Sequence, residues 1–556
     1  MAKAVTPPPP DQLEMKLFAP GMSALHRAGL GGLACTLKAM ERQYENKLLS
    51  ADKLPGPMVG KEYPWSITED TVTLKFGKPE RASEYLKKLF AFAFQIRDGV
   101  IFLPGQHYDV PSSIAVLADL QAGFTLTFLQ HGRVRALAKE PTVAQYDTKG
   151  DGTPGVTVEY KKCSYFKHQD GWEEFIDKSG CVKPAPMKVD GPISPGTVIR
   201  HVAFTGDTGA EDPPERMLPL YFAIVGCLSL PVNRGVAALL VPDVQNLLEF
   251  IYDRPAMTPG TPTDCQIANA ADAGFRAQVR VRDNPRRDAE VKLVGRQSIP
   301  GSFAMTFTPT PWASQQKSRV ATIHVPPGDD KLLDRYDRAI QHLPPRIVTR
   351  TVKESTGRGK TKVTTERPES FRTDSIVRPM IAENLAVGRK WYAGFVKLMT
   401  KINPATDKPY RNQLSFERKG LHAMIADDTM WDEAGERLVV QAVHEAISRR
   451  LGQIRAETDG EGAKGLSQAT KNRWERFRER LRLDLAGSKT ESHVRFALVD
   501  LFSRGSQNAV LRHGWEKVLP VIRKDWQLAR DLGLLALASY GGKADAEEAT
   551  TTNDTK

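Results

Sequence analysis

The clearest candidate for binding chemistry is a run of basic and aromatic residues that extends from Lys471 to Arg480. If this run is helical, a spacing of three or four residues places Arg473, Arg476 and Arg480 along one face. The adjacent face then carries the apolar residues Trp474, Phe477 and Leu481. A helix docked by these apolar groups would present guanidinium groups to the phosphates of a nucleic acid. The alternative is an ordinary amphipathic helix whose arginines are solvated.

Further basic residues in the C-terminal third are assigned the same phosphate-binding role. One group, next to Phe416, consists of Arg411, Arg418 and Lys419. Another, with Gln507 and Asn508 in the loop between its halves, consists of Arg504, Arg512, Arg523 and Lys524. Contacts of this kind position a strand but do not read its sequence.

Two loops hold side chains that could read bases, a task that needs amide or guanidinium groups able to reach base edges. Gln106 and His107 follow a Pro-Gly turn, and Asn233 and Arg234 lie between two apolar elements. Ordinary turn chemistry is the alternative for both loops, since Asn favours turns for reasons of its own backbone.

A catalytic interpretation finds less support. An acidic cluster beside Trp431 could serve a metal-dependent nuclease, although solvated charges at a helix start are the commoner occurrence. The cluster consists of Asp427, Asp428, Asp432 and Glu433. Two glycine-containing stretches, 29–34 and 359–361, match parts of nucleotide-binding fingerprints. Both lack the strand-to-helix frame that such sites require.

Metal binding is considered for Cys163, His168 and Cys181, which could supply three of the four ligands of a zinc ion. No fourth ligand stands at a usual spacing, so idle or buried thiols are the favoured interpretation. The five cysteines are scattered and form no Cys-x-x-Cys pair, which indicates no disulfide framework. We therefore expect no metal, no cofactor and no catalytic constellation.

The composition indicates a polyanionic partner. The chain has 556 residues, and 78 Lys and Arg against 66 Asp and Glu give it a formal net charge of +12. Nucleic acid is the first partner to consider for such an excess. No apolar run reaches the roughly 18 residues of a membrane span, and no secretory signal opens the sequence. We expect a soluble, cytoplasmic chain with no membrane partner.

The elements that must position these groups change in type along the chain, which predicts an α+β fold. A mixed α/β N-terminal region is expected at 1–345 and a C-terminal α-helical bundle at 376–540. Between them, the polar and basic stretch 346–375 is predicted to be a flexible linker or a hairpin loop. The polar tail 541–556 is expected to be disordered. One predicted bundle helix carries apolar residues along a single face, namely Val439, Val443, Ile447, Leu451 and Ile454.

The mixed region is predicted to begin with a helix over Met22–Glu41, capped by Ser23. Gly29, Gly31 and Gly32 are poor helix formers, so we expect another backbone to approach this helix closely.

Two further segments of the mixed region are predicted to be β-structure. The alternation of apolar residues over Phe124–Phe128 indicates a strand. Ala277–Arg282 and Val291–Val294 indicate a hairpin around Asn284-Pro285.

Two passages of the sequence resemble a known family. The first is Leu25-His-Arg-Ala-Gly-Leu-Gly-Gly-Leu33. The second runs from Val494 through Arg504 and Trp515–Leu519 to Arg523–Trp526. Both are similar to the large subunit of type I CRISPR Cascade complexes, particularly the Myxan-like branch. Members of this family have a mixed N-terminal region and a C-terminal helical bundle, which agrees with the organisation expected here.

The resemblance implies a non-enzymatic subunit that recognises the protospacer-adjacent motif in double-stranded DNA, helps to open the duplex and holds the displaced single strand. The implied partners are CRISPR RNA, the Cascade backbone and small subunits, and either a helicase-nuclease or transposition proteins. Guide pairing would read the target, while protein contacts tip a nearly balanced strand exchange. The resemblance transfers no motif-reading residue. A nucleic-acid-binding scaffold outside CRISPR and a metal-dependent nuclease remain as alternatives.

Overall fold

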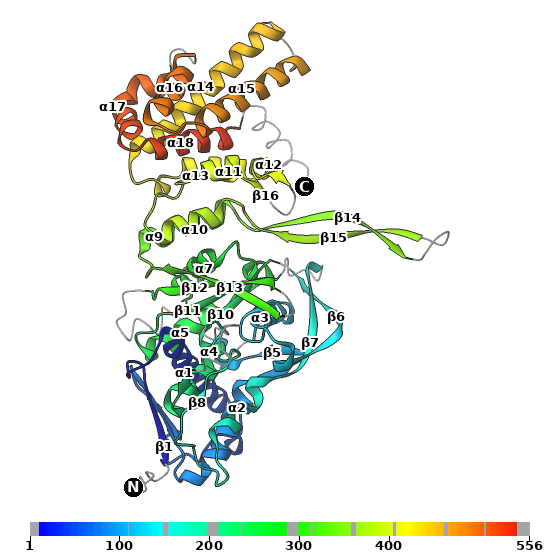
Figure 1. The fold of residues 1–556 in the computed structure, drawn as a ribbon, viewed down its shortest axis with the longest axis vertical. Coiled ribbons are helices and arrows are strands. Elements are labelled where there is room, and N and C mark those ends of the chain that lie inside the picture. Colours follow the sequence, from blue (N-terminus) through cyan, green and yellow to red (C-terminus); the bar gives the residue numbers. More distant parts are fainter. Residues whose placement is uncertain are drawn as a thin grey trace. The chain divides into compact units, whose positions relative to one another are not determined.

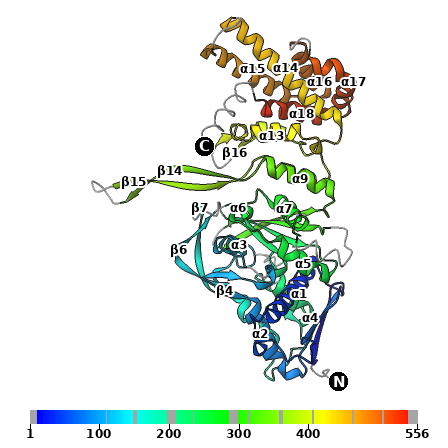
Figure 2. The same ribbon diagram turned by 180° about the vertical axis from the view of Figure 1, so that it is seen from behind.

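The structure is a computed structural model, and it contains a mixed α/β region followed by helices, as the sequence predicts (Figures 1 and 2). It describes residues 10–108, 111–147, 154–196, 210–233, 235–285, 299–312, 315–356, 363–403, 407–460, 465–504 and 508–541. The chain divides into two compact units. The first comprises Met1–Asp329 and Ile347–Thr373, and the second comprises Asp330–Arg346 and Asp374–Lys556.

The first unit is built around two helices whose backbones touch, α1 (Ala24–Glu45) and α4 (Pro214–Gly226). A β-carbon added to Gly29 would lie 1.9 Å from the carbonyl oxygen of Pro219, and one added to Gly32 would lie 2.3 Å from that of Phe222. Gly226 of α4 meets α1 in the same way. The close approach expected from the glycines is therefore confirmed, and Ser23 caps α1 as predicted.

Two antiparallel sheets flank this helix pair. The larger has the strand order β10-β11-β12-β13 and the smaller the order β1-β3-β2. The larger sheet comprises β10 (Leu228–Asn233), β11 (Val236–Pro242), β12 (Ser302–Trp312) and β13 (Gln315–Val325). The smaller comprises β1 (Gln12–Lys16), β2 (Trp65–Ile67) and β3 (Thr71–Lys75). Helices α5 (Leu247–Met257) and α7 (Ala270–Arg282) pack on each other, and α7 also packs on the larger sheet.

Two predictions of β-structure are wrong. Phe124 lies in helix α3 (Ile114–Leu126), which Ser113 caps. Five residues of alternation are too few to distinguish a strand from a helix: Phe124 lies in the last turn of α3, and Phe128, which is also buried, follows the end of the helix at Leu126. Ala277–Arg282 belongs to α7, which is buried on several sides and so shows no helical period in its apolar residues. The rest of the predicted hairpin, from residue 286 to 298, lies outside the described residues.

Short elements complete this unit around two long β-ribbons. The short elements are α2 (Ala82–Ala93), β4 (Gln95–Arg97), β5 (Val100–Phe102), α6 (Pro262–Cys265), β8 (Met187–Lys188) and β9 (Glu211–Asp212). The ribbons are β6 (Arg135–Asp147) with β7 (Pro154–Phe166), and β14 (Arg346–Thr356) with β15 (Val363–Thr373). In both views the two ribbons extend to the same side of the unit (Figures 1 and 2).

Helix α3 connects to both ribbons. It packs against β6 and β7. Its buried Asp119 accepts two hydrogen bonds, of 2.6 and 2.8 Å, from the Arg372 guanidinium at the end of β15. The stretch predicted as a linker or hairpin loop is thus a two-stranded ribbon with an anchored base, apart from residues 357–362, which are not described.

In its described residues the second unit is mainly helical and also contains the short pair β16 (Ile402–Asn403) and β17 (Lys408–Pro409). Its helices are α9 (Asp330–His342), α10 (Arg378–Ala386), α11 (Val396–Thr400), α12 (Arg411–Leu414), α13 (Arg418–Ala426), α14 (Ala434–Asp459), α15 (Gln468–Ala486), α16 (Glu491–Arg504), α17 (Ala509–Lys524) and α18 (Trp526–Ser539). Helix α14 contacts α15, α16, α17 and α18. The apolar face predicted for it is confirmed, because all five of its residues are buried. Within the described ranges, no helix has the length and apolar character needed to cross a membrane.

The contact between α1 and α4 predicts opposite effects for two glycine substitutions. Gly29→Ala should lower the free energy of unfolding by about 1–3 kcal/mol or more, because its methyl group meets a backbone carbonyl. Gly452→Ala in α14, where nothing lies within 4 Å, should instead raise it by about 0.5–1 kcal/mol. Urea unfolding followed by circular dichroism measures both. A stable Gly29→Ala protein would contradict the proposed backbone contact.

Candidate nucleic-acid interface

The basic and aromatic run lies on α15, and its apolar residues dock the helix as predicted. The Trp474 indole Nε1 donates a 3.0 Å hydrogen bond to the backbone carbonyl of Leu451 in α14. Leu481 is buried and Phe477 is half-buried. Ser467 caps the first turn by accepting a hydrogen bond from the Thr470 amide. The apolar face is therefore used, which leaves the basic face for a partner or for solvent.

Three of the six basic residues of α15, namely Arg473, Arg478 and Arg482, are engaged within the protein, and the other three are available cations. Arg473 donates to the Glu457 carboxylate at 2.7 Å and to the Thr458 hydroxyl at 2.6 Å, so it joins α15 to α14. Lys471 and Arg476 are exposed. The Arg480 side chain is 73% exposed and only 3.9 Å from Asp484, a weak surface pair. Three positive charges thus remain for an external anion.

The basic group near Phe416 lies partly beside α15. The Arg411 guanidinium is 3.8 Å from the Glu479 carboxylate of α15, which Arg482 binds more closely at 2.6 Å. Lys419 is exposed and Arg418 half-buried. Phe416 is 71% exposed, with the Arg346 guanidinium 5.4 Å from its ring centroid. The structure therefore brings Arg411 next to the cations of α15.

The remaining basic group is spread over α16 and α17. Arg504 pairs with Asp500 at 2.9 Å and Lys524 with Glu433 at 3.1 Å, while Arg512 and Arg523 are exposed. Of the two loop amides, Asn508 caps α17 and also donates to the Ala442 carbonyl, whereas Gln507 lies outside the described residues.

The first pair of candidate base readers faces the protein interior. Gln106 is 1% exposed, and its side-chain amide donates to the carbonyl of Ile224 at 2.8 Å. His107 is stacked on Phe102, and burial lowers its pKa to about 3, which keeps the imidazole neutral. Together with the fully buried Arg254, which donates to the carbonyl of Val225, the Gln106 amide satisfies the last turn of α4. These groups hold α4 in place and do not reach solvent.

The second pair occupies the turn between β10 and β11. The Asn233 backbone ends β10 and pairs with Val236, which confirms the tight connection between two apolar elements. The side chain of Asn233 and all of Arg234 lie outside the described residues.

The acidic cluster is held by basic neighbours. Asp432 accepts hydrogen bonds from Arg335 at 2.7 Å and from Lys390 at 3.1 Å. Burial alone would raise the pKa of Asp432, but these two cations outweigh it and lower the pKa. Arg437 pairs with Asp428, and Arg338 approaches Asp427. The carboxylates thus form structural ion pairs.

The three potential zinc ligands are all buried. The His168 ring lies among Phe94, Phe166 and Tyr221, and burial lowers its pKa to about 3. Within the described ranges, no cluster of three or more His, Cys, Asp or Glu side chains is arranged to hold a metal ion.

One arrangement could not be found from the sequence because Asp212 is 186 residues away from His26 in the chain. The Ser23 hydroxyl is 2.7 Å from His26 Nδ1, and His26 Nε2 is 3.0 Å from the Asp212 carboxylate. The distances resemble those of a serine-hydrolase relay. However, Ser23 is the helix cap of α1, and Arg216 binds the same carboxylate at 2.7 Å. We assign this cluster to holding α1 against the start of α4.

The chain is similar to known proteins over its whole length. A family model described as the DevT N-terminal domain matches residues 14–221, and one described as the DevT C-terminal domain matches residues 427–556. The CRISPR-associated protein Cas8a1/Csx13 of Myxococcus xanthus (strain DK1622) is 33% identical over 583 residues, which cover 100% of this chain and 95% of the relative. The similarity therefore includes both compact units.

The available cations of α15 predict a change in salt dependence. Replacing Lys471, Arg476 and Arg480 together by Ala should weaken binding of single-stranded DNA and reduce the slope of log affinity against log salt by up to about 2. A matched control removes the same charge at three exposed lysines of the first unit, Lys47, Lys61 and Lys78. Fluorescence anisotropy at several salt concentrations measures both. If the slope of log affinity against log salt is the same for both variants, the arginines of α15 are only solvated and do not bind DNA.

The burial of Gln106 predicts a loss of stability in place of a change in motif preference. Gln106→Leu leaves a buried carbonyl unsatisfied and should lower the free energy of unfolding by about 1–3 kcal/mol. Gln145→Leu, at an exposed position of β6, is the control and should have little effect. Denaturant titration of both variants tests this, and a Gln106 variant of unchanged stability would contradict the assigned role.

Proposed function

Because the chain belongs to the Cas8a1/Csx13 family of CRISPR-associated proteins, we propose that it is the large subunit of a Cascade complex in antiviral defence. The family membership that two sequence passages indicated is confirmed by the full-length match. In this role the cytoplasmic complex recognises the protospacer-adjacent motif in double-stranded DNA through this subunit. The subunit then helps to open the duplex and recruits the effector, a helicase-nuclease or transposition proteins.

The observation that carries the nucleic-acid part of the proposal is the divided basic face of α15. Arg473 is used internally, whereas Lys471, Arg476 and Arg480 have no close carboxylate partner within the part of the chain that the structure describes. Cations held on a docked helix bind phosphates at any sequence, which suits a subunit that holds a displaced strand. Arg411 extends the same patch.

The proposed subunit performs no catalysis. Exchange of a DNA duplex for a guide heteroduplex is nearly balanced, so contacts to the strand backbone are enough to tip it. The acidic residues that a nuclease would need are engaged by Arg335, Lys390 and Arg437. Strand holding therefore requires only the charges already described.

Motif recognition is assigned to the turn between β10 and β11. Of the four candidate base readers, Gln106 and His107 are buried in the first unit. Asn233 and Arg234 remain, and their types match the amide and guanidinium groups that read base edges.

The experiment that tests the proposal is assembly of the whole particle. The tagged full chain is produced together with a CRISPR array and the backbone and small subunits. We expect it to carry CRISPR RNA and these subunits through purification, and the particle to make the displaced strand of a matching duplex reactive to permanganate. The variant with Ala at Lys471, Arg476 and Arg480 should assemble normally but open less DNA.

Two results would contradict the proposal. In one, the backbone subunits and RNA form a particle that excludes this chain. In the other, the chain binds nucleic acid strongly but never together with CRISPR RNA, which would favour a scaffold outside CRISPR.

A further inference from the structure

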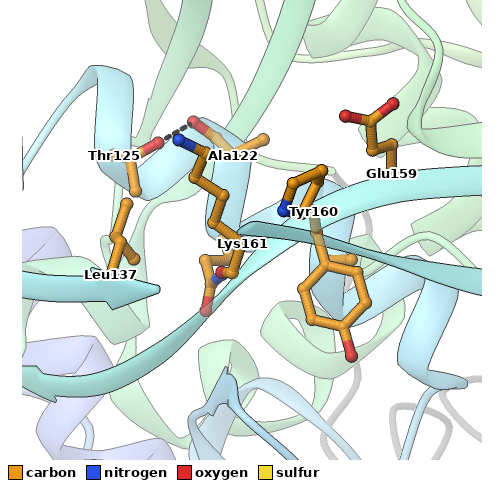
Figure 3. Close-up of a pocket in the computed structure, with 9 residues that line it drawn as sticks. Ala122, Thr125, Leu137, Glu159, Tyr160 and Lys161 are labelled. Carbon is orange, nitrogen blue, oxygen red and sulfur yellow. Dashed lines mark hydrogen bonds between the residues drawn. The ribbon is translucent and has the colours of Figure 1, made fainter. Parts of the chain in front are cut away.

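A pocket lies in the first unit where α3 passes under the ribbon of β6 and β7, and its volume is about 260 Å³ (Figure 3). It is lined by Ala118, Gln121, Ala122, Thr125, Leu137, Pro141, Glu159, Tyr160 and Lys161. The sequence analysis did not find it, because its walls come from three segments that only the fold brings together. Its lining contains none of the α15 cations, the acidic cluster or the potential zinc ligands.

Two features of the backbone build this pocket. The pairing of β6 with β7 shifts between Leu137 and Pro141, so that residues 138–140 stand opposite Lys162 alone. A bulge of this kind bends a ribbon and re-aims its side chains. On the opposite wall, α3 presents the small side chains of Ala118 and Ala122, which leave space beneath the ribbon.

The pocket is held rigidly by Gln121, which is 3% exposed. Its amide oxygen accepts from the backbone amide of Ile101 in β5 at 3.0 Å, and its amide nitrogen donates to the carbonyl of Lys161 in β7 at 2.8 Å. One side chain of α3 therefore fixes both neighbouring strands, and the site is formed before any ligand arrives.

The rim of the pocket carries a carboxylate and an ammonium group on the same face of β7. Glu159 and Lys161 project to one side of the strand and Tyr160 to the other (Figure 3). Their α-carbons are about 6.6 Å apart by strand geometry. Both side chains are exposed, and neither forms an ion pair with any residue that the structure describes. The lining also includes the apolar groups of Leu137 and Pro141, of which Pro141 pairs with Lys161 across the ribbon, and Thr125, whose hydroxyl donates to the Ala122 carbonyl at 2.8 Å.

We propose that this pocket binds one unstacked nucleobase of a single strand, a role that rests on the proposed function. A base is a flat apolar body with donors and acceptors side by side on its edge. Its ring fits between the small side chains of α3 and the apolar wall of β6. Glu159 would accept a hydrogen bond from an amino or imino group, and Lys161 would donate to a ring oxygen or nitrogen.

A side chain of a partner protein is the less suitable occupant. An apolar side chain would cover Glu159 and Lys161 without satisfying either, which costs free energy. The volume of about 260 Å³ is also slightly below that of ordinary small-molecule pockets, so it suits one ring system.

The test compares two single-stranded DNA 12-mers that differ only in their bases, one complete and one with four central abasic positions. The full chain should bind the complete strand about ten-fold more tightly. Ala122→Phe, which fills the pocket, should reduce this ratio to near one. Ala138→Phe, at an exposed position of the bulge outside the pocket, should keep it. If Ala122→Phe does not fold, the double variant Glu159→Gln with Lys161→Gln replaces it, with Lys162→Gln as its control.

The outcomes separate this inference from the function on which it rests. If both 12-mers bind equally well to the unaltered chain, or if the filled pocket keeps the ten-fold ratio, the base pocket is overturned while strand binding stands. The site would then suit a protein partner better. If neither strand binds, the proposed function fails together with it. The same comparison with complete and abasic single-stranded RNA 12-mers shows whether the pocket serves DNA or RNA. The nucleic acid that the pocket binds is the one whose ratio of complete to abasic affinity Ala122→Phe reduces to near one.

Discussion

The close contact between α1 and α4 is the constraint on which the first unit depends. Gly29 and Gly32 leave no room for a side chain between the two backbones, so each helix fixes the position of the other. The last turn of α4 then ends inside the protein, where its carbonyls need buried donors. Arg254 and Gln106 supply them. Gln106, a candidate for reading bases, is therefore used to complete a buried helix end.

In the second unit, ion pairs determine which basic residues are available to a partner. Many of its basic residues are bound by carboxylates, such as Arg335 by Asp432, Arg473 by Glu457 and Arg482 by Glu479. The pair of Arg473 and Glu457 joins α15 to α14, whereas the pair of Arg482 and Glu479 lies within α15. All such pairs contribute little to attraction at a distance, since each cancels its own field. The net charge of +12 therefore does not show where the unpaired positive charges lie. Lys471 and Arg476 are exposed on a helix whose apolar face is already docked, which leaves both cations accessible for the phosphate contacts that we propose.

Helix α3 connects three features of the first unit that are distant in sequence. Asp119 anchors the ribbon of β14 and β15 through Arg372. Gln121 fixes β5 and β7, and Ala122 forms part of the pocket wall. A helix held this firmly can position two ribbons and a pocket with little conformational freedom. The anchored ribbon base is consistent with regular structure in a polar, basic stretch that belongs to the first unit but interrupts the second unit in the sequence.

The sequence by itself determined the family, the change from mixed α/β to helical structure, and the apolar faces of α14 and α15. Periodicity, capping by Ser23 and the glycines of α1 are local properties, which a sequence displays directly. Only the tertiary structure decided what Gln106 does, because its partner Ile224 is 118 residues away and nothing near Gln106 in the chain signals burial. It also decided that Arg473 is engaged while Arg476 is not. The helical spacing placed both on one face, but the position of Glu457 on another helix distinguishes them.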